Sequence, residues 1–506
     1  MKAEKILFDA YNPYIVNLAE FEIKNIQTNS RLIEAGDLFV AIKGHTVDGH
    51  QFIEQAIQQG AHLVLANKSF QKITDSKSLL QGKILFVDNT YHYLSTVMNR
   101  FLDYPSQKMN IFGITGTNGK TSTANILIQI LTKTSQKSAV LGTTGIRTQN
   151  YSAPLNNTTP DPLILQNVFH QMVELEVKNM IMIVSSIGLS ENRTKETDFS
   201  VAIFTNFSQD HLDFHGSMEN YLEAKGKFFK ELEPYNSRGL ENFAIINRDD
   251  DAADYFIEQS KAAVLTYGLD SSADYYASDC AYSEFDTKFT LHHNQKTYSV
   301  QSSLIGEFNV YNTLAAIAAA HSQGIALPKI IAELKNLSSA DGRLEVVSDT
   351  TKDEITAIVD FAHTPDSLEK ALQTLAHINH RRIISVFGCG GDRDASKRPI
   401  MAKIGVTNSD HVIFTSDNPR TENPERILEE MTNELTEENY CQIVSRKEAI
   451  QHAINLAEKD DIVLIAGKGH EDYQIIGTEK YPFDDSKCVK EALEIKNKHS
   501  KIDLNS

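Results

Sequence analysis

The chain has 506 residues, of which 41% are hydrophobic and 23% are charged. This composition is typical of a globular protein that is too long for one core, so we expect about two to four domains. The formal net charge of −18 argues against a general nucleic-acid binder. The sequence has no apolar run of the roughly 20 residues that span a bilayer, no secretory signal and no metal-like cysteine spacing. We therefore expect a cytoplasmic protein without stable membrane insertion. The expected form is a monomer, although composition does not indicate the oligomeric state.

The first predicted domain covers residues 1–107 and is a small α/β unit. Residues 37–42 and 62–66 have the apolar pattern of strands, and residues 50–60 have helical spacing. The second predicted domain covers residues 108–338, and the third covers residues 339–506.

A glycine-rich loop opens the second domain, between a predicted strand at 109–115 and a predicted helix at 124–131. The loop reads Gly116-Thr117-Asn118-Gly119-Lys120-Thr121-Ser122. Its backbone amides and the helix N-terminus can bind a phosphate, the Lys120 ammonium adds a charge, and the Thr121 hydroxyl can reach a magnesium ion. The general pattern places a glycine where Ile114 stands, so a ligand-free glycine turn is the alternative.

Two further strands are predicted in this domain, at 178–186 and 200–206, and both end in polar residues. Ligands of open parallel sheets bind beyond the carboxyl ends of the strands. Residues 209–215 then bring two histidines and two aspartates together. This cluster is either a metal and phosphate site with His211 as a ligand, or a polar loop with a helix cap at Asp210 or Asp213.

The end of the second domain has the pattern of a β-hairpin followed by a helix. Strands are predicted at 288–291 and 296–300, with the paired His292 and His293 as turn residues, and an alanine-rich helix is predicted at 311–320. At the end of the chain, residues 487–501 are predicted to form a solvated helix.

The third domain is predicted to contain a parallel sheet with helical crossovers. The strands are expected at 355–360, 382–387, 411–415 and 461–466. Each is followed by a polar or glycine-rich loop, at 360–363, 388–393, 416–420 and 467–471. Four such loops at one edge of a sheet predict a binding cleft.

Taken together, these motifs resemble those of the Mur ligases over nearly the whole chain. The matching stretches are 29–31, 36–39, 113–121, 157–160, 204–213, 224–225, 306–312, 341–345, 359–365, 417–420 and 467–471. The resemblance implies an α/β protein of three domains: a UDP-binding N-terminal domain, a central phosphate-loop ATPase with a parallel sheet, and a C-terminal Rossmann-like domain that binds an amino acid. In particular, the chain resembles the subgroup that adds the third peptide residue to UDP-N-acetylmuramoyl-L-alanyl-D-glutamate.

The resemblance also implies a reaction and its site residues. ATP, with Mg²⁺, phosphorylates the D-glutamyl carboxylate, and the amino group of the incoming residue attacks the acyl phosphate. The catalytic residues would be Lys120, His211, Lys225 and Arg343. Lys225 would be carbamoylated to N6-carboxylysine and would bind metal with Thr121 and His211. The remaining assignments are ATP at Gly116–Ser122, Asn309, Asn312, Arg343 and Asp360, and the UDP-substrate at Ser30, Asn157, Thr158, Thr159, Ser186 and Arg193.

The incoming amino acid would be bound by Asp417, Asn418, Pro419, Arg420, Gly467 and Glu471. In the resembling enzymes, an arginine at the position of Arg420 accompanies meso-diaminopimelate, whose distal carboxylate it can bind through two parallel hydrogen bonds. Glu471 and Gly467 would bind the distal ammonium group. The resemblance therefore implies diaminopimelate rather than lysine as the substrate.

One departure from the family pattern concerns the metal site. Ile183 stands where the family carries a metal-binding glutamate, and Ile187 stands where it carries a histidine. Water, Asp210 or the phosphates could complete the shell of a magnesium ion. Two alternatives therefore stay open: a paralogue of folylpolyglutamate-synthetase type with another amine and acid, and a non-catalytic binding protein. Asn157–Pro160 and Arg420 argue against the first, and Lys225 and His211 argue against the second.

Overall fold

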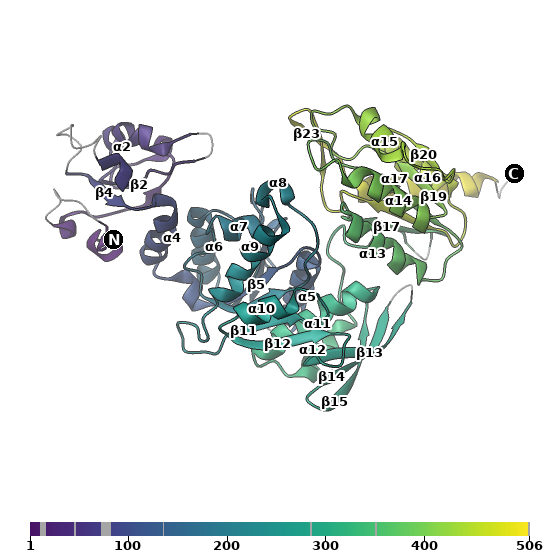
Figure 1. Ribbon diagram of the computed structural model, residues 1–506, viewed down its shortest axis with the longest axis horizontal. Helices are drawn as coiled ribbons and strands as arrows, with labels where there is room; N and C mark the ends of the chain where they lie inside the picture. The colour runs from purple at the N-terminus through teal and green to yellow at the C-terminus, as the bar shows by residue number, and fades with distance from the viewer. Residues whose placement is uncertain are drawn as a thin grey trace. The chain divides into compact units, whose positions relative to one another are not determined.

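The computed structural model describes residues 1–10, 17–44, 47–71, 82–134, 136–283, 286–349 and 352–503. Figure 1 draws the chain. The chain divides into two compact units, which are described separately below. Unit 1 comprises residues 1–113, 136–201 and 231–242, and unit 2 comprises residues 114–135, 202–230 and 243–506. None of the helices in the described ranges has the length and apolar character that a membrane span requires.

Unit 1 begins with a parallel four-stranded sheet in the order β1-β2-β3-β4. Its strands are β1 (Ile26–Gln27), β2 (Leu38–Val40), β3 (Leu63–Asn67) and β4 (Ile84–Val87), so the predicted strands at 37–42 and 62–66 are confirmed. The helices of this part are α1 (Glu4–Leu7), α2 (Ile53–Gln59) and α4 (Thr90–Phe101), with 3₁₀ turns at Leu18–Glu20, Ser30–Leu32, Gly49–Phe52, Lys68–Phe70 and Pro105–Lys108. Apolar side chains of α4 pack on one face of the sheet and those of α2 pack on the other.

The second part of unit 1 contains β9 (Asn179–Ile183), whose five residues are all buried. β9 pairs in parallel with β6 (Ser138–Gly142), and β6, β7 (Gly145–Arg147) and β8 (Ser152–Ala153) continue as an antiparallel series. The helices here are α6 (Pro162–Glu174) and α7 (Ser186–Ser190). The strand predicted to reach Ser186 is shorter, because the Ser185 side chain caps α7 by accepting a hydrogen bond from the Gly188 amide at 3.1 Å.

Strands β5 (Asn110–Thr115) and β10 (Phe199–Phe204) cross the boundary between the two units. Unit 2 then holds α5 (Lys120–Lys133), α8 (Leu212–His215), α9 (Met218–Lys230) and α11 (Glu307–Ser322). Helices α5 and α11 pack against each other, and eleven residues of α11 are buried. The alanine-rich sequence of α11 permits this close packing because its side chains are small.

A five-stranded segment of unit 2 has the order β15-β14-β13-β12-β11. Its strands are β11 (Phe243–Asn247), β12 (Ala263–Gly268), β13 (Tyr275–Tyr282), β14 (Thr287–His293) and β15 (Lys296–Ser302), with helices α10 (Ala253–Gln259) and α12 (Leu327–Leu334) beside them. The predicted hairpin is confirmed by the antiparallel pairing of β14 with β15. The prediction that His292 and His293 form its turn is wrong: both belong to β14, and their rings stack on Tyr276 and Tyr275 at centroid distances of 4.2 and 4.0 Å.

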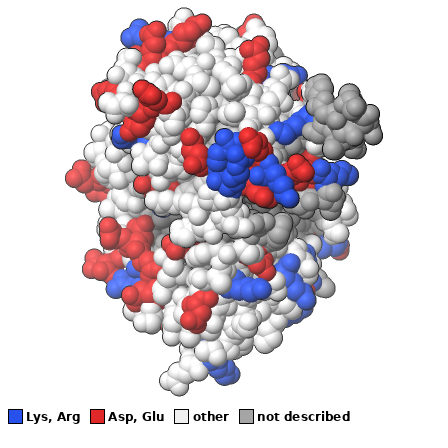
Figure 2. Space-filling model, turned by 90° about the vertical axis from the view of Figure 1, so that its right-hand side faces the viewer, with Lys and Arg blue, Asp and Glu red and all other residues white. Residues whose placement is uncertain are grey.

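The C-terminal part of unit 2 is a sheet covered by helices on both faces (Figure 1). The strand order is β16-β17-β21-β18-β19-β20, and all strands except β16 run in parallel, as predicted. The strands are β16 (Glu345–Val346), β17 (Thr356–Asp360), β18 (Ile383–Phe387), β19 (His411–Phe414), β20 (Tyr440–Gln442) and β21 (Ile462–Ala466), and a separate hairpin consists of β22 (Tyr473–Ile476) and β23 (Glu479–Pro482). On the surface drawn in Figure 2, acidic and basic side chains are interspersed.

Five helices complete the C-terminal part. α13 (Pro365–Ala376), α14 (Lys397–Asn408) and α15 (Pro424–Thr432) pack on one face of the sheet, and α16 (Arg446–Leu456) and α17 (Asp485–Asp503) pack on the other. The prediction at 487–501 is correct that this stretch is helical and wrong that the helix is solvated on all sides. Val489, Ala492 and Leu493 of α17 are buried in the core, so α17 is an amphipathic helix of the fold.

Candidate functional site

The phosphate loop joins β5 to α5 and depends on two glycines with positive φ. Gly116 has φ 143° and Gly119 has φ 81°. A Cβ atom on Gly116 would lie 1.9 Å from Thr205 Oγ1, and one on Gly119 would lie 2.5 Å from Asn312 Oδ1. A larger residue at either position would have to displace the Thr205 or Asn312 side chain and would adopt a backbone conformation that L side chains rarely adopt.

Two lysines converge on this loop. Lys120 Nζ donates to the carbonyl oxygens of Gly116 and Thr117 at 2.9 and 2.6 Å, and Lys225 Nζ of α9 donates to Gly116 O at 2.8 Å. Burial lowers the pKa of Lys120 to about 8. Burial, together with the nearby Lys120 charge, lowers the pKa of Lys225 well below its usual value. Burial therefore favours the uncharged, nucleophilic form of the Lys225 amine next to the phosphate loop.

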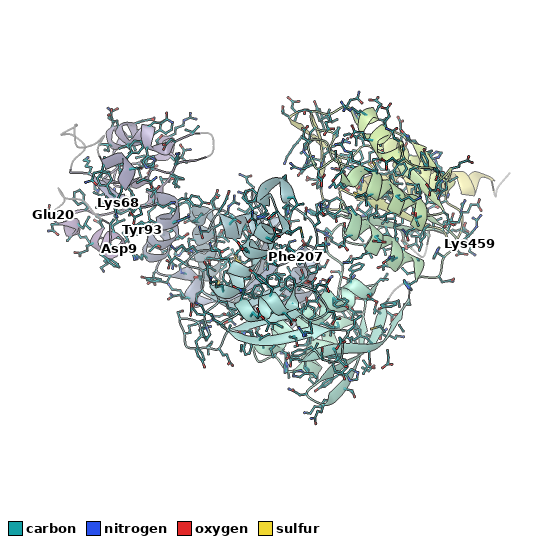
Figure 3. All side chains as sticks on the ribbon, viewed as in Figure 1. Asp9, Glu20, Lys68, Tyr93, Phe207 and Lys459 are labelled. Carbon is teal, nitrogen blue, oxygen red and sulfur yellow. The ribbon has the colours of Figure 1, made fainter. Side chains whose placement is uncertain are left out.

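Aromatic residues enclose the Lys225 side chain. Its Nζ lies 4.5 Å from the centre of the Tyr221 ring, and the Tyr221 hydroxyl lies 3.2 Å from Thr117 Oγ1. Phe207, labelled in Figure 3, packs on Tyr221 with ring centroids 5.1 Å apart. The Phe207 amide donates to Asp250 Oδ2 at 2.8 Å, which fixes the loop that follows β10.

The predicted cluster at 209–215 lies in the same part of unit 2. His211 has φ 53° and begins α8 without capping it through its side chain, and its Nε2 lies 3.5 Å from Asp210 Oδ2. The His211 ring is 6.2 Å from the Tyr221 ring, and Asp210 interacts electrostatically with both Lys120 and Lys225. The structure therefore brings His211, Asp210 and Lys225 together around the loop.

A cavity of about 470 Å³ adjoins the phosphate loop. Its lining includes Asn118, Gly119 and Ser122 from the loop and α5, Asn312 from α11, and Arg343 and Asp360. The volume and the polar lining suit a nucleotide. Asn309 is buried beside the cavity, where its Oδ1 accepts a hydrogen bond from Asn312 Nδ2 at 3.2 Å.

Arg343 and Asp360 belong to the C-terminal part of unit 2 and also line this cavity. The Arg343 guanidinium lies 4.5 Å from the centre of the Phe361 ring, and its Nε is a buried donor without an acceptor among the described residues. Asp360 accepts hydrogen bonds from the Leu344 and Ala362 amides at 2.7 and 2.8 Å. Burial raises the pKa of Asp360, and the nearby Arg343 charge opposes this shift. The unpaired Arg343 donor fits an anionic ligand.

In unit 1, three of the predicted substrate residues lie together. Thr159 Oγ1 donates to Ile183 O at 3.0 Å and accepts from the Ser185 amide at 2.9 Å, next to the buried Ser186. Arg193 Nη1 donates to Thr159 O at 2.8 Å and also forms ion pairs with Glu191 and Asp161. Elsewhere in unit 1, Asn157 is exposed, Thr158 is half-buried, and the buried Ser30 begins the 3₁₀ turn Ser30–Leu32.

Ile183 lies at the end of β9 with only 2% of its surface exposed. A Cβ on Gly142 of the paired strand β6 would come 2.7 Å from Ile183 Cδ1, so the isoleucine fills the space beside this glycine. The residue thus contributes packing to the sheet, and its side chain has no oxygen with which to bind a metal.

Loops of the C-terminal sheet hold Arg420. Its φ is 51°, its amide donates to Ile475 O at 3.1 Å, and its carbonyl accepts from the Gly477 amide at 2.7 Å. The Arg420 side chain donates to Gly391 O at 2.8 Å. Arg393 is not among the predicted site residues, yet its charge lies close enough to lower the pKa of Arg420, after the larger effect of burial. Two neighbouring guanidinium groups suit a ligand with carboxylates.

The remaining predicted amino-acid ligands surround this loop. Asp417, Asn418 and Pro419 are buried, and a Cβ on Gly467 (φ 117°) would lie 2.7 Å from Asp417 Oδ2. Asn418 Nδ2 donates to Glu471 Oε2 at 3.0 Å. This site therefore contains both acidic and basic side chains, which suits a ligand that carries both an ammonium and a carboxylate.

The described residues include no group of three or more His, Cys, Asp or Glu side chains placed to hold a metal. Thr121, in the first turn of α5, supplies a hydroxyl, and His211 supplies a ring nitrogen. Because magnesium prefers oxygen ligands, these residues fit it only if the nucleotide phosphates and an anionic group on Lys225 add further oxygens. Burial favours the uncharged form of the Lys225 amine, which is the form that can carry such a group.

Comparisons with known proteins agree with these features. The chain matches the models of the Mur ligase family catalytic domain at residues 22–101, the Mur ligase middle domain at 114–320, and the Mur ligase glutamate ligase domain at 342–469. A protein of Bacillus cereus named UDP-N-acetylmuramoyl-L-alanyl-D-glutamate--2,6-diaminopimelate ligase is 42% identical over 93% of this chain and 94% of its own length.

Solved structures give the same result for the fold. A structure of a UDP-N-acetylmuramoyl-L-alanyl-D-glutamate--2,6-diaminopimelate ligase matches with a TM-score of 0.69 and 33% identity, over 95% of this chain and 96% of the other. MurF ligase from Thermotoga maritima in complex with ADP shares the fold, with a TM-score of 0.64 and 18% identity, over 94% of this chain and 98% of the other. The phosphate loop with its two lysines, the three-domain α/β fold and the full-length similarity together show that the chain belongs to the Mur ligase family.

Proposed function

We propose that this Mur ligase joins meso-diaminopimelate to the D-glutamyl carboxylate of UDP-N-acetylmuramoyl-L-alanyl-D-glutamate in a reaction that consumes ATP. The observation that carries this proposal is that Arg420 lies beside Arg393 and near Glu471, which accepts a hydrogen bond from Asn418. The site therefore offers positive charge for a carboxylate and negative charge for an ammonium group at the distal end of an amino acid. The name of the Bacillus cereus relative supports it. The enzyme would act in the cytoplasm, in the synthesis of peptidoglycan precursors.

In the proposed reaction, the γ-phosphoryl group of ATP passes to an oxygen of the D-glutamyl carboxylate, and ADP is released. The amine of diaminopimelate then forms a bond to the acyl carbon and loses a proton, while the C–O bond to phosphate breaks. The loop amides and Lys120 stabilise the charge of the transferring phosphoryl group. Arg343 binds the nucleotide through its unpaired donor, and Asp360, Asn309 and Asn312 complete the nucleotide site.

Thr121, His211 and a carbamate on Lys225 would hold magnesium together with the phosphates. When bound, the metal neutralises phosphate charge. The lowering of the Lys225 pKa by burial supports the carbamate, because only the neutral amine adds to carbon dioxide.

The UDP-muramoyl dipeptide is proposed to bind to unit 1 residues Ser30, Asn157, Thr158, Thr159, Ser186 and Arg193. We also propose the domain boundaries 1–107, 108–338 and 339–506, with the UDP site in the first domain, the ATPase in the second and the amino-acid site in the third. A monomer is proposed as the working form.

Phosphate release from the purified protein tests the proposal directly. With ATP, magnesium and the UDP-muramoyl dipeptide present, we expect release with meso-diaminopimelate and little with L-lysine. Release with lysine alone would agree with an amide ligase but would contradict the proposed specificity for diaminopimelate. No release with either would contradict the proposal.

Ile183 supports one second candidate, a protein that binds the same ligands with little or no catalysis. A buried isoleucine supplies no metal ligand at the end of β9. The variant Ile183→Glu separates the two candidates, with Ile183→Gln as the control for polarity without charge. A large rate gain from a near-dead wild type, seen with glutamate and absent with glutamine, would favour the binding protein. An active wild type would favour the ligase.

A further inference from the structure

Lys468 follows strand β21 and is completely buried, with a side-chain exposure of 0%. Its ammonium donates to Glu471 Oε2 at 2.9 Å and to Asn418 Oδ1 at 3.1 Å, and it lies 5.6 Å from the centre of the Tyr473 ring. A buried lysine is costly unless it is paired, so this charge is held in place by its partners. Lys468 has no role in the mechanism proposed above.

The Asn418 side chain is used within the protein. Its Oδ1 accepts hydrogen bonds from both Lys468 Nζ and the Ile475 amide, the latter at 2.9 Å, and its Nδ2 donates to Glu471 Oε2. A carbonyl oxygen has two lone pairs, so Oδ1 has no capacity left for a ligand. Asn418 therefore links Lys468 and Glu471 to the β22–β23 hairpin.

Glu471 is the partner that remains able to bind a ligand. Its side chain is 21% exposed. Both of its side-chain hydrogen bonds, within the part of the chain that the structure describes, go to Oε2. The second oxygen, Oε1, is left for an ammonium group of a ligand. Two donors on one carboxylate oxygen also fix the rotation of the side chain.

We propose that Lys468 is a positioning residue that fixes the Glu471 carboxylate for the distal ammonium of the incoming diamino acid. This inference rests on the function proposed above and adds a specificity-determining residue that does not itself touch the substrate. A glutamate side chain held in one rotamer binds without losing further side-chain entropy. Without Lys468, the carboxylate keeps only Asn418 as a donor and moves among several rotamers.

The test measures steady-state kinetics of Lys468→Met, which keeps the length and removes the charge. We expect the KM for diaminopimelate to rise about tenfold or more, while the KM for ATP and kcat stay within about twofold, because loss of a charged hydrogen bond weakens ligand positioning. The matched control is Lys459→Met, which changes an exposed lysine and should leave all three values unchanged. An unchanged KM for diaminopimelate in Lys468→Met would overturn the inference.

A double-mutant cycle with Glu471→Gln shows whether Lys468 acts through Glu471. We expect the double variant Lys468→Met/Glu471→Gln to have the same KM for diaminopimelate as Glu471→Gln alone. Additive effects would overturn the inference. If Lys468→Met does not fold, Lys468→Arg replaces it, since it keeps the charge but moves the donors, and a wild-type KM in that variant would also count against the inference. A wild type without diaminopimelate-dependent phosphate release would instead contradict the proposed function.

Discussion

The amines of Lys120 and Lys225 donate to the same acceptor, the carbonyl oxygen of Gly116, at 2.9 and 2.8 Å. Lys120 belongs to the first turn of α5 and Lys225 to α9, so the phosphate loop holds both at one point. Two buried ammonium groups this close repel each other, and burial lowers the pKa of both lysines. Repulsion and burial therefore both favour a state in which one of the two amines is uncharged.

Replacement of Lys225 by arginine is expected to reduce phosphate release by about a hundredfold or more, the usual cost of losing one group that stabilises the charge of the transition state. The guanidinium stays charged and cannot add carbon dioxide. The matched control is Lys230→Arg, which changes an exposed lysine at the end of the same helix and should be neutral. Mass spectrometry of the native protein should find one added carbon dioxide in the wild type and none in Lys225→Arg. An active Lys225→Arg would contradict the carbamate.

Replacement of Arg420 by alanine should raise the KM for meso-diaminopimelate by about 10- to 100-fold, as expected for a lost charged hydrogen bond. Activity with L-lysine, which has no distal carboxylate, should change much less, so the ratio of the two kcat/KM values is the measurement. Arg426→Ala serves as the control, because Arg426 is 73% exposed on α15. An equal loss of kcat/KM with both amino acids would show that Arg420 does not bind the distal carboxylate.

The affinity for ADP should fall as the pH rises through the pKa of Lys120, which burial lowers to about 8. Below that pH the side chain is charged and attracts the phosphates, and above it the charge is lost. Bound nucleotide favours the charged form, so the midpoint should lie somewhat above 8. Calorimetric titrations between pH 7 and 10 measure this. Lys120→Arg stays charged and should give a flat profile, and a flat wild-type profile would contradict the prediction.

Asp485→Ala is expected to destabilise the C-terminal part of unit 2 by about 3–5 kcal/mol. Arg446 donates to both carboxylate oxygens of Asp485 at 2.8 and 2.7 Å, and both side chains are completely buried, so the substitution leaves a buried charge without its partner. The exposed pair Lys447–Glu491 links the same two helices, and Glu491→Ala should cost less than about 1 kcal/mol. Urea unfolding of both variants measures the difference, and similar losses would contradict the prediction.

Much of the fold could be predicted because its signals are local. The strands β17, β18, β19 and β21 are short apolar runs that end in polar or glycine-rich loops, the usual pattern of parallel strands covered on both faces. The errors had non-local causes. His292 and His293 are strand residues because their rings stack on tyrosines of β13, and α17 is half-buried because it packs on α16 and the sheet.

The sequence by itself determined the phosphate loop, the parallel C-terminal sheet and the residues that can carry the chemistry, because these depend on residue types at short spacing. Only the tertiary structure decided how those residues are used. Gly116 and Lys225 are 109 positions apart, yet they meet through one hydrogen bond, and burial at that point lowers the pKa of the lysine. Likewise, Lys468 and Asn418 are 50 positions apart and meet beside Glu471. Burial and hydrogen bonding between distant segments arise from chain packing, which no local pattern encodes.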